Sequence, residues 1–504
     1  MRPNFLRMRQ LYTIATLFFA LLAISSCGDK PQTLYAISVS KDAICTSNAQ
    51  EVTLSYVVHD NVMNSGTKFT ATSSEAWAEV VDTSTIGEVR VRVEDNEGST
   101  RTATITISAL GCVTAKAQIT QYGVAPATAN HTLMFYFFGT SLGRYFKINL
   151  ADAARAIETG ILGNNNRVLF FRQESRNSGY IGELYYDITN GKCIEVRIKD
   201  ITLTESIITP EKIGEHIAAM AEIAPAERYG IIFAGHGQGW ITREIINSDR
   251  DVSALSAGYN PWIPAIGAEV TRAFGENNVQ VNIDELAEGI KCSNVEIDYI
   301  LFDACFMSNI EAIYDLRHTA NYIIAAPCEI MGNGFPYHRT LPYLFKDYGA
   351  ETDYVGAARS YYKFYESEYT GGVRCGSISV FKCDEIETLA EATKSVMASA
   401  KSDYNENELQ TYEGQHPHHF YDFGEWVNVV ATDDAAKSAF NQAMEQCIIA
   451  TYTLDTFYSA YGTYGTYPID REVYTGVTTS APSKAYPNDW KQTNWYKDVI
   501  ELDN

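Results

Sequence analysis

The chain has 504 residues, of which 46% are apolar and 12% aromatic, so it can fill large cores and a largely disordered chain is excluded. Its length predicts two or three domains. The formal charge of −23, from 39 basic and 62 acidic residues, argues against a nucleic-acid binder, which needs a basic face.

The N-terminus has the features of an export signal. Basic residues precede an apolar run from Leu11 to Ile24, which is short for a membrane span. The run ends in Ser25-Ser26-Cys27, which resembles a bacterial lipobox. We therefore expect a signal peptide over residues 1–26 and a lipid on Cys27. An ordinary cleaved signal peptide and an uncleaved anchor are the alternatives.

A lipid on Cys27 implies an exported bacterial lipoprotein that is anchored in the outer membrane and lies in the periplasm or at the cell surface. No later stretch is apolar and long enough to span a bilayer, so the lipid would be its only contact with the membrane.

Residues 32–123 are predicted to form a small β-sandwich. Apolar and polar residues alternate along Val52–Val58, Glu88–Val93 and Thr102–Ile107, and turn residues separate these runs. Trp77, the stretch from Asn96 to Arg101 and the closing run from Ala117 to Gly123 resemble a BACON domain, a module of secreted Bacteroidetes proteins. The resemblance implies a spacer or a module that contacts glycans.

The cysteines do not form a zinc pattern. The chain has ten of them and no pair at CxxC spacing. Export permits disulfides, and Cys45 with Cys112 is the pair that we expect to be bridged.

Residues 124–130 are rich in Pro, Ala and Thr and predict a linker. From residue 131 to 504, apolar strands alternate with helical patterns, which predicts an α/β domain whose parallel sheet is covered by helices on both faces. The expected strands are 132–138, 167–171 and 322–326, and the expected helices are 210–224, 305–317, 353–369, 385–400 and 434–452. The last fifty residues or so, rich in Tyr, Thr and Gly, form a C-terminal extension without a clear pattern.

A histidine and a cysteine each follow one of these strands. Gly235-His236-Gly237 comes after the apolar run Ile231–Ala234, and Cys305 comes shortly after the run Ile297–Phe302. Ligands bind at the carboxyl ends of strands in open α/β sheets. The two residues are therefore a candidate base and a candidate nucleophile.

The stretch from Phe233 to Gly237, followed by that from Leu301 to Ser308, resembles the clostripain family of cysteine peptidases, which are relatives of caspases. The resemblance covers roughly residues 130–500. It implies a caspase-like fold and an endopeptidase that acts on proteins or peptides through an acyl-enzyme.

The catalytic roles follow from the same residues. Cys305 would attack the peptide carbonyl, and we expect a helix beginning there to favour its thiolate. His236 would protonate the leaving amine. The backbone N–H groups of Gly237 and Cys305 are the natural donors to the oxyanion.

The pocket for the residue before the cut is less clear. Clostripains cut after Arg or Lys with an acidic pocket residue, which should fall after Met331, near Asn333; Asn333 is neutral, and the acidic Glu329 is out of register. Asp303 lines the pocket or supports the site, or has only a structural role. The preference is therefore either basic, or neutral and polar.

Self-cleavage often activates members of this family. The long loop from Ile241 to Asn282 carries Arg243, Arg250 and Arg272, with Lys291 nearby, and is where such a cut would fall. Self-cleavage there requires that the pocket accept a basic residue.

No cofactor and no metal is expected. His416, His418 and His419 lack a carboxylate at ligand spacing. Clostripain itself is associated with calcium, for which Asp249 and Asp251 are candidate ligands without an EF-hand pattern.

Two functions remain open at this point. The first is a cysteine endopeptidase that uses His236 and Cys305. The second is a surface lipoprotein that keeps the peptidase fold, is catalytically inactive and binds glycans or proteins. The neutral Asn333 and the sandwich favour the second, whereas the intact His and Cys motifs favour the first.

Overall fold

The structure is a computed structural model that describes residues 35–40, 42–59, 67–98, 100–123, 128–163, 165–203, 208–248, 262–274, 280–481 and 484–501. Within these ranges no helix is long and apolar enough to cross a membrane. The expected signal peptide, the lipid on Cys27 and most of the expected linker lie outside the described residues.

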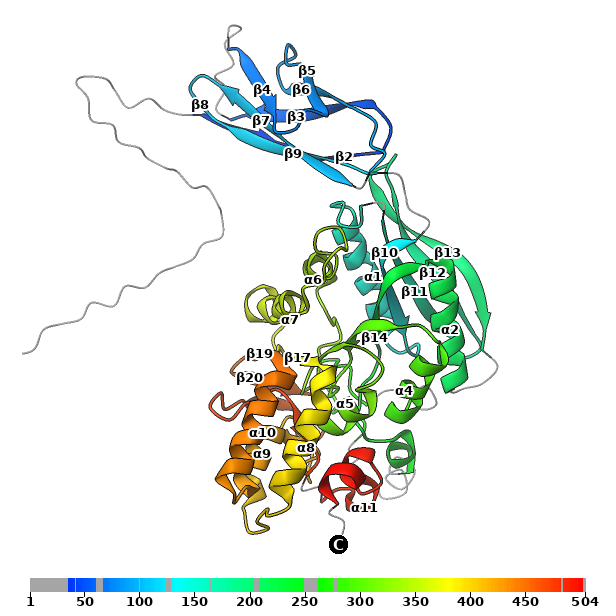
Figure 1. Ribbon diagram of the computed structural model, residues 1–504, viewed down its shortest axis with the longest axis vertical. Coiled ribbons are helices and arrows are strands. Elements are labelled where there is room, and N and C mark those ends of the chain that lie inside the picture. Colours follow the sequence, from blue (N-terminus) through cyan, green and yellow to red (C-terminus); the bar gives the residue numbers. More distant parts are fainter. Residues whose placement is uncertain are drawn as a thin grey trace, which may run out of the picture.

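The N-terminal part of the chain folds into two β-sheets that share one core, and Figure 1 shows it at one end of the molecule. The strand orders are β5-β6-β3-β1-β8 and β2-β9-β7-β4, which confirms the predicted sandwich. The strands are β1 (Tyr35–Val39), β2 (Ala43–Cys45), β3 (Gln50–Val58), β4 (Phe69–Ser73), β5 (Ala78–Asp82), β6 (Glu88–Val93), β7 (Arg101–Ala109), β8 (Cys112–Val113) and β9 (Ala115–Gln121).

The expected disulfide in this sandwich is wrong. Cys45 and Cys112 are free thiols on strands of different sheets. Cys45 points into the core, where its thiol donates to the carbonyl oxygen of Thr120 at 3.7 Å.

The second part of the chain is built on a sheet of order β13-β12-β11-β10-β14-β15-β16-β17-β19. The strands are β10 (Ala129–Phe137), β11 (Asn166–Ser175), β12 (Ser178–Asp187), β13 (Lys192–Thr202), β14 (Ala226–Ala234), β15 (Ile297–Asp303), β16 (Tyr322–Ala325), β17 (Ile378–Lys382) and β19 (Ile448–Tyr452). The strands from β11 to β16 along this order are parallel, and both edges are antiparallel. The sheet is therefore mixed rather than wholly parallel, because the two residues between β11 and β12 can join only antiparallel strands.

The central strands are buried on both faces. Phe135 of β10 packs on Tyr337 of α6 (Tyr337–Leu344), while its neighbour Tyr136 packs on His216 of α2 (Pro210–Ile223), on the opposite face. Every side chain from Leu133 to Phe137 is 0% exposed. This is why these strands are continuous apolar runs and do not alternate.

Helices cover both faces of the sheet, as predicted. One group contains α1, α6 and α7, and the other contains α2, α4 and α5. The bounds are α1 (Gly143–Ile157), α2 (Pro210–Ile223), α4 (Ile283–Cys292), α5 (Ile310–Leu316), α6 (Tyr337–Leu344), α7 (Tyr354–Lys363) with the π-turn η1 (Phe364–Glu368), α8 (Ile386–Met397), α9 (Phe423–Val430), α10 (Asp434–Cys447) and α11 (Pro487–Trp490). The short strands β18 (Tyr421–Asp422), β20 (Thr456–Ser459), β21 (Gly465–Pro468) and β22 (Thr478–Thr479) complete the C-terminal part.

Two helix predictions need correction. Residues 305–309 are not helical, because Phe306 has a left-handed backbone (φ 61°) and Asn309 caps α5 by accepting from the Ala312 N–H at 3.3 Å. The helix expected over 434–452 ends at Cys447, and the residues after it form β19 on the edge of the sheet next to β17.

Candidate active site

His236 and Cys305 lie at the carboxyl ends of two neighbouring strands. Ala234, the last residue of β14, is paired with Asp303, the last residue of β15. The chain after β14 packs directly on the chain after β15: a Cβ on Gly237 would lie 2.1 Å from the Cys305 carbonyl oxygen and 2.8 Å from its nitrogen. Glycine is therefore required at 237 for the two loops to meet.

A strand from the chain's own long loop lies across this edge. The Gly332 N–H donates to the Val270 carbonyl at 2.7 Å, and the Arg272 N–H donates to the Ile330 carbonyl at 2.9 Å. Between these bonds, Thr271 and Met331 form an antiparallel bridge. Residues 270–272 are thus held as an extended peptide is held by β-augmentation.

The carbonyl oxygen of Arg272 accepts two converging hydrogen bonds. The Gly237 N–H donates to it at 2.8 Å and the Cys305 N–H at 3.3 Å. These are the two N–H groups that the sequence predicts as donors to the oxyanion. Their arrangement can stabilise negative charge on that oxygen.

His236 contacts the next residue of the same segment, Ala273. Its Nδ1–H donates to the carbonyl oxygen of Ala273 at 3.1 Å, and the Tyr461 hydroxyl donates to the same oxygen at 2.7 Å. The opposite ring nitrogen, Nε2, is 2.9 Å from the Ser141 hydroxyl. The carbonyl of Arg272 therefore contacts the backbone N–H of Cys305, and the carbonyl of Ala273 contacts an oriented imidazole.

The guanidinium of Arg272 fills a closed pocket. Its Nη1 is 2.9 Å from Asp303 Oδ2, and both side chains are 0% exposed. Nη2 donates to Asn149 Oδ1 at 2.7 Å, and Nε donates to the Gly332 carbonyl at 3.2 Å. The carboxylate of this pocket and its hydrogen-bond acceptors together match the charge and the donors of an arginine side chain.

Of the three residues expected to line this pocket, only Asp303 contacts the guanidinium with its side chain. Asp303 is at the base of the pocket. The side chain of Asn333 is exposed, and only its carbonyl takes part, by accepting from Asn149 Nδ2 at 2.8 Å. Met331 is buried and pairs through its backbone with Thr271.

The protonation states follow from burial. Burial raises the pKa of the Asp303 carboxyl, and the Arg272 charge partly offsets that rise. Burial and, next, the Glu329 charge raise the pKa of the Cys305 thiol well above its ordinary value. The Ile330 N–H donates to the Cys305 sulfur at 2.9 Å and opposes this rise in part. Because α5 starts only at Ile310, no helix dipole lowers the pKa of the thiol, contrary to our expectation.

Three residues of the site were not identified from sequence. Asn149 is on α1, Ser141 is in the loop after β10, and Tyr461 follows β20. None has a local motif. In the sequence, Arg272 is only one basic residue of a long loop.

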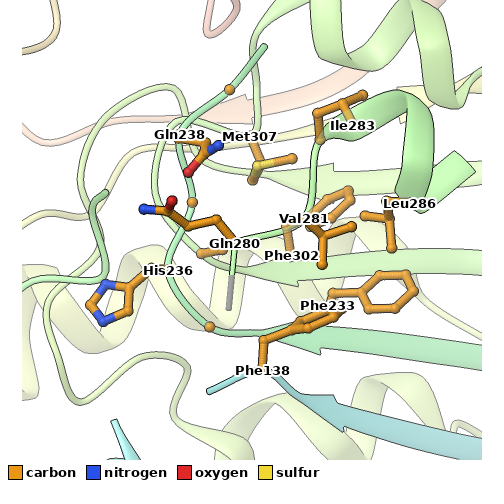
Figure 2. A pocket seen from close by; sticks show the side chains of 14 residues that line it. Phe138, Phe233, His236, Gln238, Gln280, Val281, Ile283, Leu286, Phe302 and Met307 are labelled. Atoms are coloured by element: carbon orange, nitrogen blue, oxygen red, sulfur yellow. The ribbon is translucent and has the colours of Figure 1, made fainter. Parts of the chain in front are cut away.

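A small apolar cavity of about 50 Å³ lies beside His236. Figure 2 shows its walls, Phe138, Phe233 and Ile283 among them, with the His236 ring turned away from them. Residues 270–272 do not line this cavity. They occupy the cleft formed by residues 330–332 and the loops after β14 and β15.

The described residues contain no cluster of three or more His, Cys, Asp or Glu that could hold a metal. His418 instead pairs with the buried Glu413 at 3.2 Å, and His419 stacks on Trp262. Asp249 and Asp251 lie outside the described residues.

Comparison with known proteins gives consistent results. The family model "Clostripain family" matches residues 260–501. A secreted C11 cysteine protease from Bacteroides thetaiotaomicron is 28% identical, with 74% of this chain and 100% of that chain covered and a TM-score of 0.64. An inactive zymogen C11 protease from Parabacteroides distasonis is 29% identical, with 75% and 99% covered and a TM-score of 0.61. No curated protein matches the chain.

Proposed function

Since the chain belongs to the clostripain family of cysteine peptidases, we propose that it is an endopeptidase that cuts after arginine, with Cys305 as nucleophile and His236 as general acid and base. The single observation that carries this proposal is the position of its own Arg272–Ala273 bond, with the carbonyl on two N–H donors and the guanidinium on Asp303. A preference for a neutral residue would leave the buried Asp303 carboxylate without a partner, which is costly.

The reaction starts from a Cys305 thiolate and a His236 imidazolium. The thiolate attacks the arginine carbonyl carbon, and the oxygen takes the charge between the N–H groups of Gly237 and Cys305. The C–N bond breaks as Nδ1–H gives its proton to the leaving amine, which leaves an acyl-enzyme. Water then gives a proton to Nδ1 and its hydroxide to the acyl carbon, which releases the acid and restores the ion pair.

Ser141 fits a positioning role. Its hydroxyl is within hydrogen-bond distance of Nε2, so it fixes the ring with Nδ1 toward Ala273, the residue after the proposed cut. The ring orientation then does not depend on the substrate.

We further propose that the form described here is a precursor that processes itself. Residues 270–272 fill the cleft, so no other peptide can bind until they leave. Cys305 is buried and its sulfur accepts the Ile330 N–H, so the cut would wait for a rearrangement that frees the sulfur. One cut after Arg272 would then open the cleft.

The test is the fate of the purified full chain. We expect wild type to convert to two fragments, with Ala273 as the new N-terminus by mass spectrometry, and to hydrolyse arginyl peptides afterwards. Cys305→Ala should remain one chain and hydrolyse nothing. An intact wild-type chain whose Cys305 also ignores a thiol-reactive arginyl probe would instead support the inactive binding protein.

Export and anchoring are a separate proposal, motivated by the lipobox-like sequence that ends in Cys27. Radiolabelled palmitate should label wild type but not Cys27→Ala, and the variant should leave the membrane fraction. The sandwich would then act as a spacer between the membrane and the peptidase. A glycan array would test whether the sandwich also binds glycans.

A further inference from the structure

The cleft contains a second closed pocket, next to the one for arginine. Thr271, the residue before Arg272, is 4% exposed, and its hydroxyl donates to Glu329 Oε2 at 2.5 Å. Glu329 itself is 0% exposed. From the sequence, Glu329 is only an out-of-register acid for the arginine pocket.

The rest of the Glu329 carboxyl is already satisfied by the C-terminal part of the chain. Oε1 accepts from the Ser459 hydroxyl at 2.5 Å and from the Ala460 N–H at 3.0 Å. The Ala460 N–H is also 3.2 Å from Oε2. The remaining acceptor position of Oε2 faces Thr271, so it loses its hydroxyl donor when residues 270–272 leave the cleft.

We propose that Glu329 is a specificity-determining residue that selects a small hydroxyl side chain, threonine or serine, immediately before the arginine. This rests on the proposed function, because it assigns a subsite of the same cleft. A buried acceptor without a donor costs much more than the bond contributes when made, so a side chain without a hydroxyl is disfavoured.

The chemistry of the pocket favours a hydroxyl over a cation. Burial raises the pKa of Glu329 to about 7, so both protonation forms are present near neutrality. A hydroxyl can pair with both, because it donates to the carboxylate and accepts from the acid. A lysine or arginine would need its long stem in a pocket that encloses threonine.

The neighbouring position is different. Val270 is 48% exposed, so the residue two before the arginine should contribute little selectivity. Exchanging valine and threonine at these two positions changes one hydroxyl for one methyl group in each case. The pair therefore offers a matched comparison.

The test uses processed wild-type protein and four fluorogenic peptides, Glu-Val-Xaa-Arg-aminomethylcoumarin, with Xaa as Thr, Ser, Val or Lys. We expect kcat/KM for Thr and Ser to exceed that for Val and Lys by roughly 10- to 100-fold. In Glu329→Met, the ratio of kcat/KM for the Thr peptide to kcat/KM for the Val peptide should fall to about one. If this variant does not fold or mature, the wild-type ratio still decides the question.

The same comparison can be made within the chain. Thr271→Val should slow processing after Arg272 by roughly tenfold, whereas Val270→Thr should leave it within about twofold of wild type. If valine and threonine peptides are cleaved equally, or if the lysine peptide is preferred, Glu329 is not such a determinant although the peptidase assignment stands. If no arginyl peptide is cleaved at all, the proposed function itself fails.

Discussion

Replacing Asp303 with asparagine tests the arginine pocket directly. Asp303→Asn keeps the shape of the side chain and removes its charge. In the structure, Nη1 of Arg272 would lose its ion pair but keep the Asp303 backbone carbonyl at 3.1 Å, and Nη2 and Nε would keep Asn149 and Gly332. The loss is therefore at the lower end of the range for a broken buried pair, about 3 kcal/mol, or roughly 150-fold in kcat/KM.

The assay compares peptides that end in arginine or in citrulline, which has the same shape without the charge. Wild type should prefer arginine strongly, and Asp303→Asn should discriminate between the two by no more than a few-fold. Far-ultraviolet circular dichroism controls for folding, and a precursor that stays uncut is an expected result of the same loss. An unchanged preference for arginine in the variant would refute the role of Asp303.

Three further predictions concern other parts of the site. Gly237→Ala places a Cβ 2.1 Å from the Cys305 carbonyl oxygen, so it should displace an oxyanion donor and lower kcat by roughly 100-fold or more in a steady-state peptide assay. Ser141→Ala should lower kcat by about tenfold, leave KM unchanged and shift the pH–rate profile that reports His236, whereas a purely structural role would leave that profile in place. The pKa of Glu329 is raised by burial to about 7, so folding favours its protonated form and its ionisation destabilises the precursor as pH rises from about 4.5 to 7. In the Cys305→Ala background, Glu329→Gln should thus be nearly neutral at pH 5 and relatively stabilising at pH 8, by up to about 3 kcal/mol in urea unfolding, and a pH-independent difference would contradict this assignment.

The parts of this site that sequence predicted are those set by local pattern. Apolar runs that end in glycine or in small polar residues marked β14 and β15, and parallel strands bring such ends to one edge. His236, Gly237 and Cys305 could therefore be named before their surroundings were known. The β-sandwich followed from period-two alternation in the same way.

What sequence did not predict depends on contacts between distant segments. Asn149 is far from Asp303 in the chain, and nothing about its helix marks it as a partner of a guanidinium. Arg272 is one of several basic residues in its loop, and only the pairing of Val270 and Arg272 with residues 330–332 distinguishes it. The helix expected from Cys305 failed because Phe306 takes a left-handed conformation that no propensity predicts for phenylalanine.

The groups proposed to recognise a substrate are the same groups that keep the precursor closed. Asp303, Glu329 and the two N–H donors all hold residues 270–272, so each contact that favours substrate binding also favours the closed cleft before the cut. Cleavage after Arg272 would change this balance without any new contact. Residues 270–272 would then end in a free C-terminus, and this chain end could leave the cleft to a substrate. Tight self-binding is thereby compatible with an active product, and a substitution such as Thr271→Val weakens inhibition and processing together.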